Sequence, residues 1–411
     1  MGSDLPARPI WRALYLAYGA IDVSYRTEAG KRQHFRHRLA QGEIDKATQT
    51  FRRLPRLAWQ ASQGDAHVVA DVIYCDRPLT SLTSMGSGRY WISPDDVRPE
   101  WHRYGNKHHY DSVFVLWPQS NLRTGEGIPS GGWGLAIGAC DWTGGATYAT
   151  VANGPEAWWE MPTVGEPWLH EWLHGVAAHY AGQGCLLPDG DADGADRHGY
   201  IRSATAGWLP YYQDLMTCQV IEAGQCKGIP RAAWQQAGVR GHRLPVAVDY
   251  FDQSRNSFSL LGIFRGGVTW ETGSHPALQI SGWGEYTQRL GITGEVWIRL
   301  HAWIPPRGTL TLILWLKDPD DDPIVWHLPT PQQAGWHTVQ LWMDPTSACL
   351  YQKLWPDHKN PPDWQRHPTA IRDPWMLSNL RICYHDGLAI AAHEWEAVKL
   401  DELIVSQVKL A

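Results

Sequence analysis

The sequence predicts an α+β domain followed by an all-β antiparallel sandwich, and this prediction rests on how the apolar residues are spaced. Up to about residue 245, short apolar runs separated by glycines alternate with segments of helical spacing. From about residue 246, apolar and polar residues alternate with a period of two, which is typical of strands that bury one face. Turns rich in proline, aspartate and glycine separate these later runs. We therefore expect two domains, residues 1–245 and residues 246–411.

The first domain is expected to mix strands and helices. Residues 12–24 and 66–75 form strand-like apolar runs, and residues 33–60 between them have largely helical spacing. Shorter apolar runs predict three more strands, at 111–117, 134–139 and 146–151. A strong helix is expected to begin at Pro167, because proline suits the first turn of a helix, and to end near Gly182 or Gly184.

The second domain is expected to consist of strands joined by turns. In residues 296–304 the even-numbered residues are apolar and share one face, whereas Trp297, Arg299, His301 and Trp303 share the other. Residues 310–316, 339–343 and 398–405 repeat this scheme. Such a density of alternating strands is typical of an antiparallel sandwich.

The composition excludes several classes of protein. With 43 % hydrophobic and 19 % charged residues, the chain is too apolar for a disordered protein. No stretch approaches the roughly 20 apolar residues of a membrane helix, so we expect no membrane span. The formal net charge of −6 gives no basic field, so we expect no nucleic-acid partner. No signal peptide follows Met1-Gly2-Ser3, which has the look of an expression scar, and we expect a secreted or extracytoplasmic protein whose signal was removed.

The seven cysteines give a mixed signal. Their number is odd, so at least one thiol is unpaired in a monomer. Cys218 and Cys226 flank a short polar loop, and two interpretations stay open: a small disulfide or two reduced thiols.

One pentapeptide inside the expected helix carries the strongest chemical signal. Residues 170–174 read HEWLH, the pattern HExxH. Because four residues advance a helix by about 400°, His170 and His174 project from one face and can bind one ion. Glu171 lies beside that face, where it could take a proton from water. The other side of the helix is apolar and would be buried.

Through this motif the chain resembles the zincin metallopeptidases. The resemblance implies a zincin-like fold for residues 1–245, Zn²⁺ as cofactor, His170 and His174 as zinc ligands and Glu171 as general base. In zincins an edge strand precedes the active-site helix and pairs with the substrate. Residues 146–151 occupy that place in this sequence.

The third zinc ligand is less well defined by the sequence. The longer metzincin pattern HExxHxxGxxH is not met, because its eleventh position is Tyr180. We favour His198 as the third ligand, followed by Asp196. His179 could reach the metal only if the helix broke after His174. Glu222, the next glutamate after Glu171, is a further candidate for the third ligand. Zincins often use a tyrosine or histidine to stabilise the oxyanion, and we assign this role to Tyr200, with Tyr211 and Tyr212 as alternatives.

An acidic repeat lies between the helix and His198. Asp189, Asp191, Asp193 and Gly194 match the first half of a calcium-binding EF-hand loop, D-x-D-x-D-G. The twelfth position is Tyr200 rather than the bidentate glutamate of a regular EF-hand. Three interpretations stay open: a Ca²⁺ site, a solvated acidic turn, or direct participation in the zinc site.

The second domain resembles concanavalin-like or carbohydrate-binding jelly-roll sandwiches, through its strand rhythm and a final strand at residues 398–405. Such domains often bind glycans by stacking indoles on sugar rings. The chain holds 25 tryptophans, and Trp297, Trp303, Trp315 and Trp342 lie opposite the apolar face of their strands. We predict that they either pack between sheets or domains or bind glycans.

Together these features predict a zinc-dependent metallopeptidase, a hydrolase that acts on a protein or peptide substrate. The main alternative is a zincin-like scaffold with little catalysis that binds glycans or proteins. Hydrolysis of a non-peptide amide or ester is a third possibility, because a fold does not fix the substrate.

Overall fold

The computed structural model describes residues 5–104, 109–132, 134–154, 159, 161–251, 263–271, 277–316, 323–328, 331–370, 376–385 and 397–409. The chain forms two compact units, one of which is Pro9–Arg243. The other comprises Leu244–Ala411 together with the N-terminal segment Met1–Arg8. The expected boundary at residues 245–246 lies close to this division. The N-terminal segment groups with the second unit because strand β1 (Ala7–Pro9) pairs with β15 (Arg243–Asp249).

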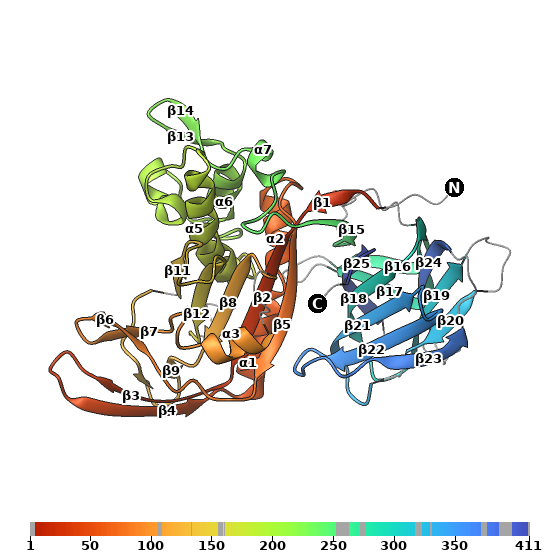
Figure 1. The fold of residues 1–411 in the computed structure, drawn as a ribbon, viewed down its shortest axis with the longest axis horizontal. Coiled ribbons are helices and arrows are strands. Elements are labelled where there is room, and N and C mark those ends of the chain that lie inside the picture. The colour runs from red at the N-terminus through yellow and green to blue at the C-terminus, as the bar shows by residue number, and fades with distance from the viewer. Residues whose placement is uncertain are drawn as a thin grey trace. The chain divides into compact units, whose positions relative to one another are not determined.

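A five-stranded sheet forms the centre of the first unit (Figure 1), in the order β11-β12-β8-β2-β5. Its strands are β2 (Trp11–Tyr18), β5 (Val68–Cys75), β8 (Ser112–Trp117), β11 (Gly134–Ile137) and β12 (Thr147–Ala152). Strands β12, β8, β2 and β5 pair in parallel, and β11 pairs antiparallel to β12 at one edge. Every residue of β2 is buried, which explains its nearly continuous apolar sequence.

Helices cover one face of this sheet. They are α1 (Gln41–Phe51), α2 (Leu54–Ala61), α5 (Glu166–Gly182) and α6 (Leu209–Met216). Odd-numbered β2 residues such as Tyr15 share a core with side chains of these helices, whereas even-numbered ones such as Leu14 belong to a second core on the other face. Shorter helical segments are α3 (Arg98–Tyr104), α7 (Arg231–Trp234) and the 3-10 turns η1 (Asp191–Asp193) and η2 (Asp196–His198).

Short hairpins complete the first unit. Their strands are β3 (Ala20–Arg26) with β4 (Arg32–Arg38), β6 (Thr83–Gly86) with β7 (Arg89–Trp91), β9 (Ser120–Asn121) with β10 (Glu126–Gly127), and β13 (Val220–Glu222) with β14 (Gln225–Lys227). The helix expected over residues 33–60 is therefore wrong at its start. Residues up to Arg38 pair with β3, and only Phe35 on β4 is buried, so the helical spacing begins at α1.

Helix α5 carries the HExxH motif, and it forms where the sequence places it. Gly165 precedes it with a left-handed φ of 92°, and Pro167 lies in its first turn. Its apolar side is buried against the sheet, where it packs on β12 and β11. A Cβ atom on Gly175 would lie 2.8 Å from Cβ of Thr147, so glycine permits this close approach of helix and strand.

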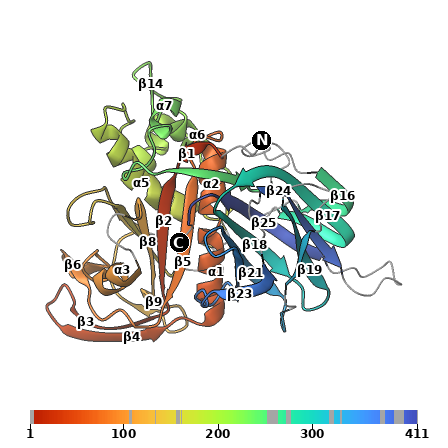
Figure 2. The ribbon, with the colours of Figure 1, turned by 45° about the vertical axis from the view of Figure 1, so that its right-hand side comes forward.

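The second unit is a single twelve-stranded sheet. After β1 and β15, its strands are β16 (Ile263–Glu271), β17 (Ala277–Thr293), β18 (Val296–Ile304), β19 (Thr309–Leu316), β20 (Ile324–His327), β21 (Gly335–Asp344), β22 (Cys349–Pro356), β23 (Gln365–Ala370), β24 (Met376–His385) and β25 (Ala397–Ser406). Figure 2 shows these strands from a second direction. The pairings among β15 to β25 are antiparallel. Taken with the first unit, the chain is mostly β-structure with few helices.

The sheet of the second unit encloses one apolar core. Leu300 of β18 and Leu312 of β19 belong to the same core cluster, although the two strands lie far apart in the sheet order. Two portions of the sheet therefore pack face to face as a sandwich. The even-numbered residues of β18 and β19 face this core, which confirms the predicted alternation, although Leu316 is only partly buried.

Two further features concern the chain as a whole. Among the described residues, no helix is both long and apolar enough to cross a membrane. All seven cysteines are free thiols, so Cys218 and Cys226 are not joined.

Candidate metal centre

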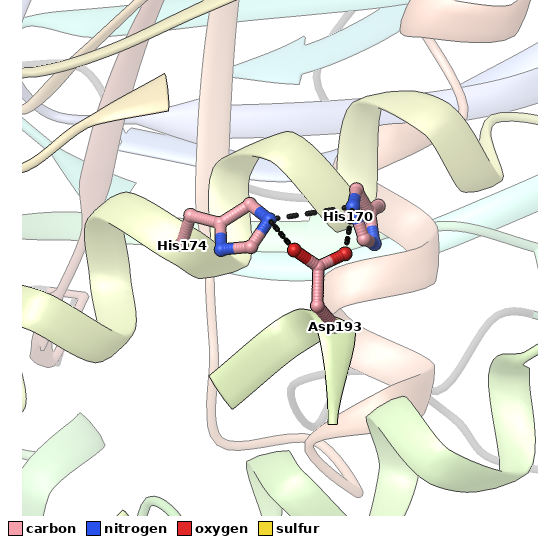
Figure 3. Close-up of side chains that lie close together, drawn as sticks. All are labelled: His170, His174 and Asp193. Carbon is pink, nitrogen blue, oxygen red and sulfur yellow. Dashed lines mark hydrogen bonds and ion pairs between the residues drawn. The ribbon is translucent and has the colours of Figure 1, made fainter. Parts of the chain in front are cut away.

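Helix α5 brings two imidazoles together, as the HExxH spacing predicts. Nε2 of His170 and Nε2 of His174 lie 3.3 Å apart (Figure 3). Both histidines line a cavity of about 690 Å³. The two Nε2 atoms therefore lie close together at this cavity.

Asp193 of the η1 turn lies opposite the two histidines. Its Oδ1 is 3.4 Å from Nε2 of His170, and its Oδ2 is 3.7 Å from Nε2 of His174. A tetrahedral zinc ion with bonds of about 2.0–2.1 Å separates its ligand atoms by about 3.3 Å. The observed spacings are close to this value. Within the part of the chain that the structure describes, one group of three or more His, Cys, Asp or Glu side chains could hold a metal ion. Its members are His170, His174 and Asp193.

His198, the expected third ligand, faces away from this group. Its Nε2 lies 2.9 Å from the backbone carbonyl oxygen of Asp189, and its ring stacks on Tyr211. His179 is also directed away from the histidine pair. His179 contacts Gln183, because α5 continues without a break through Gly175.

Two acidic alternatives complete the comparison. Glu222 accepts a hydrogen bond from the backbone N–H of Asp189 and pairs with Lys227. Asp196 lines the cavity but is not one of the three residues that could hold the ion. The structure thus favours Asp193 as the third ligand, which corresponds to direct participation of the acidic repeat in the metal site.

Asp189, Asp191 and Asp193 do not form a group that could hold one ion among the described residues. Asp189 pairs with Arg197 at 2.9 Å, and Asp191 Oδ1 lies 2.6 Å from Nδ1 of His174. Asp193 faces the histidine pair. Asp191 and Asp193 of η1 contact different nitrogens of His174, whereas Asp189 lies before this turn and contacts Arg197.

Glu171 lies in the wall of the same cavity and is 4 % exposed. Burial raises the pKa of its carboxyl to about 7, against the opposing influence of His170 and His174. A carboxyl group with a pKa near neutrality can both accept and return a proton, which is what a general base in hydrolysis must do.

The second ring nitrogen of His170, Nδ1, also has a partner, as does that of His174. Nδ1 of His170 lies 3.0 Å from the hydroxyl of Tyr212, which lines the cavity. Tyr200, the residue we assigned to the oxyanion, instead donates to Oδ2 of Asp214 at 2.5 Å and is not among the lining residues. Of the three tyrosines considered, the structure brings Tyr212 to the site, while the hydroxyl of Tyr211 donates to the carbonyl oxygen of Asp191.

The edge strand beside the cavity is β11 and not the segment at 146–151. That segment is β12, which is paired on both sides, with β11 and with β8. Gly134, Leu135 and Ala136 of β11 line the cavity. A Cβ on Gly134 would lie 1.9 Å from the carbonyl oxygen of Thr150 and 2.8 Å from Cδ of Glu171, so only glycine fits there. The role of this residue could not be recognised in the sequence because both close neighbours are remote along the chain.

Among the described residues of the second unit, some tryptophans stack on other rings and others lie beside a cation. Trp297 and Trp342, paired across β18 and β21, lie 4.9 Å apart with an angle of 10° between their planes. Trp342 also stacks on Tyr351 of β22 at 4.8 Å. The ring of Trp303 has Lys399 above it, and that of Trp315 has Arg381.

Comparisons with known proteins find similarity to solved structures over about 40 % of the chain, at low sequence identity. No protein-family model matches the chain, and neither does any curated protein. A protein of unknown function from Shewanella oneidensis MR-1 is similar over 40 % of this chain and 88 % of its own, with 10 % identity and a TM-score of 0.27. The metal-free lectin I-B4 from Griffonia simplicifolia is similar over 39 % of this chain and 98 % of its own, with 10 % identity and a TM-score of 0.28. Lectin I from Ulex europaeus, in complex with the methyl glycoside of α-L-fucose, is similar over 39 % and 96 %, with 10 % identity and a TM-score of 0.27.

Proposed function

We propose that the unit Pro9–Arg243 is a zinc-dependent peptidase. The observation that carries the proposal is the convergence of two Nε2 atoms and one carboxylate at spacings close to those of a tetrahedral zinc site. His170, His174 and Asp193 would hold the ion. Bound there, zinc would polarise a substrate carbonyl and increase the acidity of water.

Glu171 is the general base in this proposal. Its carboxylate would take a proton from the attacking water and return it to the departing amine nitrogen. Its burial and its pKa near 7 suit both transfers. Tyr212 lines the same cavity and, through its hydroxyl at Nδ1 of His170, would help to orient that ligand.

The exposed edge of β11 would bind the substrate. A peptide added antiparallel to an edge strand gains main-chain hydrogen bonds without needing a particular side chain. Because β11 lines the cavity beside Glu171, a peptide bound along it would carry a carbonyl past the histidine pair. This arrangement favours a protein or peptide substrate over a small ester.

Glu171→Gln tests the proposal. The variant keeps all three ligands, so it should bind zinc with wild-type stoichiometry and lose at least about 100-fold in the rate of cleavage of a peptide library. Glu126→Gln, an exposed glutamate of β10, is the matched control and should cleave like wild type. Unchanged cleavage in Glu171→Gln, or no zinc in the wild-type protein, would overturn the assignment.

A second candidate function, glycan binding, belongs to the second unit. It is favoured by the stack of Trp297, Trp342 and Tyr351 across three neighbouring strands, in which Trp342 and Tyr351 are only half-buried. Aromatic faces of this kind can stack on sugar rings. A glycan array compares the full chain with Trp342→Ala, and Trp315→Ala on β19 is the control. Binding lost only in Trp342→Ala supports this function, whereas binding that is absent or equal in all three proteins rejects it.

A further inference from the structure

The turn that supplies Asp193 contacts helix α5 at a second point. Oδ1 of Asp191 lies 2.6 Å from Nδ1 of His174, on the side of the ring opposite Nε2. Asp193 faces Nε2 of the same ring. Two aspartates of one short turn therefore hold the two nitrogens of one imidazole.

The position of Asp191 is fixed by its backbone. Its φ is +37°, in the left-handed region that non-glycine residues rarely adopt, and it follows Gly190 with φ +84°. Such a conformation costs conformational free energy and persists only where neighbouring contacts hold it. Here the carbonyl oxygen of Asp191 accepts from the Tyr211 hydroxyl, and its carboxylate also accepts from the N–H of Ala192.

We propose that Asp191 is a positioning residue that fixes the tautomer and the orientation of His174. A carboxylate at Nδ1 can only accept, so it keeps the proton on Nδ1 and leaves the lone pair of Nε2 facing His170 and Asp193. Outer-shell carboxylates of this kind orient a ligating histidine and increase its basicity. Nδ1 of His170 lies 3.0 Å from the Tyr212 hydroxyl, whereas Nδ1 of His174 lies 2.6 Å from a carboxylate oxygen.

This inference rests on the proposed function for the identity of the ion but not for the tautomer. The alternative is a purely structural role, in which Asp191 stabilises the η1 turn and has no effect on His174. Tyr211→Phe separates the two roles, because it removes a contact to the backbone of Asp191 and leaves its carboxylate on His174.

Two measurements on the full chain test the role of Asp191. In the metal-free wild-type protein, under alkaline conditions where the ring is neutral, ¹⁵N NMR should show His174 protonated at Nδ1 alone. Asp191→Ala should give a mixture of tautomers, and Asp191→Asn, which retains an acceptor oxygen, should lie between the two. Chelator competition should show zinc affinity lowered roughly 10- to 100-fold in Asp191→Ala and within about threefold of wild type in Tyr211→Phe.

The outcomes distinguish this inference from the proposed function. If wild-type protein binds no zinc, the peptidase proposal fails, and the tautomer of His174 still decides the role of Asp191. A wild-type His174 protonated at Nε2 overturns the inference. So does a result in which wild type, Asp191→Asn and Asp191→Ala have the same tautomer and the same zinc affinity. If Asp191→Ala does not fold, the wild-type tautomer and the Asp191→Asn affinity provide the same decision.

Discussion

Oδ1 of Asp193 lies 3.4 Å from Nε2 of His170, whereas the ring of His198, five residues further along the chain, turns toward the carbonyl of Asp189. The two candidate ligands are thus separated by a single turn of backbone. Their different surroundings give a direct way to identify the third ligand of the centre.

Asp193→Ala should lower zinc affinity by more than the roughly 100-fold that loss of an outer-shell partner can cost, because it removes one of three ligands. His198→Ala should leave zinc affinity within a few fold of wild type, since its ring contacts Tyr211 and a backbone carbonyl. Zinc stoichiometry after dialysis and competition with a chelator measure both variants. Loss of zinc in His198→Ala together with retention in Asp193→Ala would identify His198 as the ligand instead.

Much of this framework can be predicted from local sequence patterns. The helix expected from Pro167 is α5, Glu166–Gly182, and the strand expected at residues 296–304 is β18. Both follow from the regular spacing of apolar residues over many positions. The pair His170 and His174 follows from the same periodicity, because it depends only on the helix that carries it.

The third member of the site depends on non-local structure. Whether Asp193 or His198 reaches the histidines is decided by the left-handed backbone at Gly190 and Asp191 and by packing on Tyr211, which no short pattern encodes. The edge strand has the same difficulty. Residues 134–139 and 146–151 have similar apolar runs, and only the pairing of β12 with β8 determines that β11 is the free edge.

Gly175→Ala should destabilise the first unit. The added methyl group would lie 2.8 Å from Cβ of Thr147, and overpacking of this kind costs about 1–3 kcal/mol in the free energy of unfolding. Gly182→Ala on the same helix is the control, because a Cβ there meets no atom within 4 Å. It should stabilise the protein by up to about 1 kcal/mol. Urea unfolding of the full chain with chelator present measures both, and equal effects would refute the close approach of α5 and β12.

A buried histidine should stabilise the second unit. Nε2 of His301 lies 2.8 Å from Oδ2 of Asp357, and Nδ1 lies 3.3 Å from Oδ2 of Asp401, with all three residues buried. His301→Ala removes the group between two buried carboxylates, and we expect a loss of roughly 3–5 kcal/mol in the free energy of unfolding. His358→Ala, at an exposed position, should change it by less than about 0.5 kcal/mol. Calorimetry of the full chain resolves the effect, and a transition unchanged in His301→Ala would contradict it.

Asp111 should give the first unit a characteristic dependence on pH. Its side chain is fully buried, and its two oxygens accept from the backbone N–H groups of Arg12 and Arg240, each at 2.7 Å. Burial raises the pKa of this carboxyl from 3.8 to about 6, although both N–H groups and both arginines oppose the change. Since the folded pKa exceeds the unfolded value, the folded state keeps a proton that the unfolded state releases between about pH 4 and 6.

The free energy of unfolding should therefore fall as pH rises through this window, by roughly 3 kcal/mol at about 1.4 kcal/mol for each unit of pKa difference. Asp111→Asn cannot release a proton, so its stability should lack this component. The difference between wild type and Asp111→Asn, measured by urea unfolding at several pH values, should shrink from pH 4 to pH 6 and stay constant above. Asp141→Asn, at an exposed position, provides the matched control. A difference that grows with pH would mean that the folded protein stabilises the ionised form of Asp111, contrary to the effect of its burial.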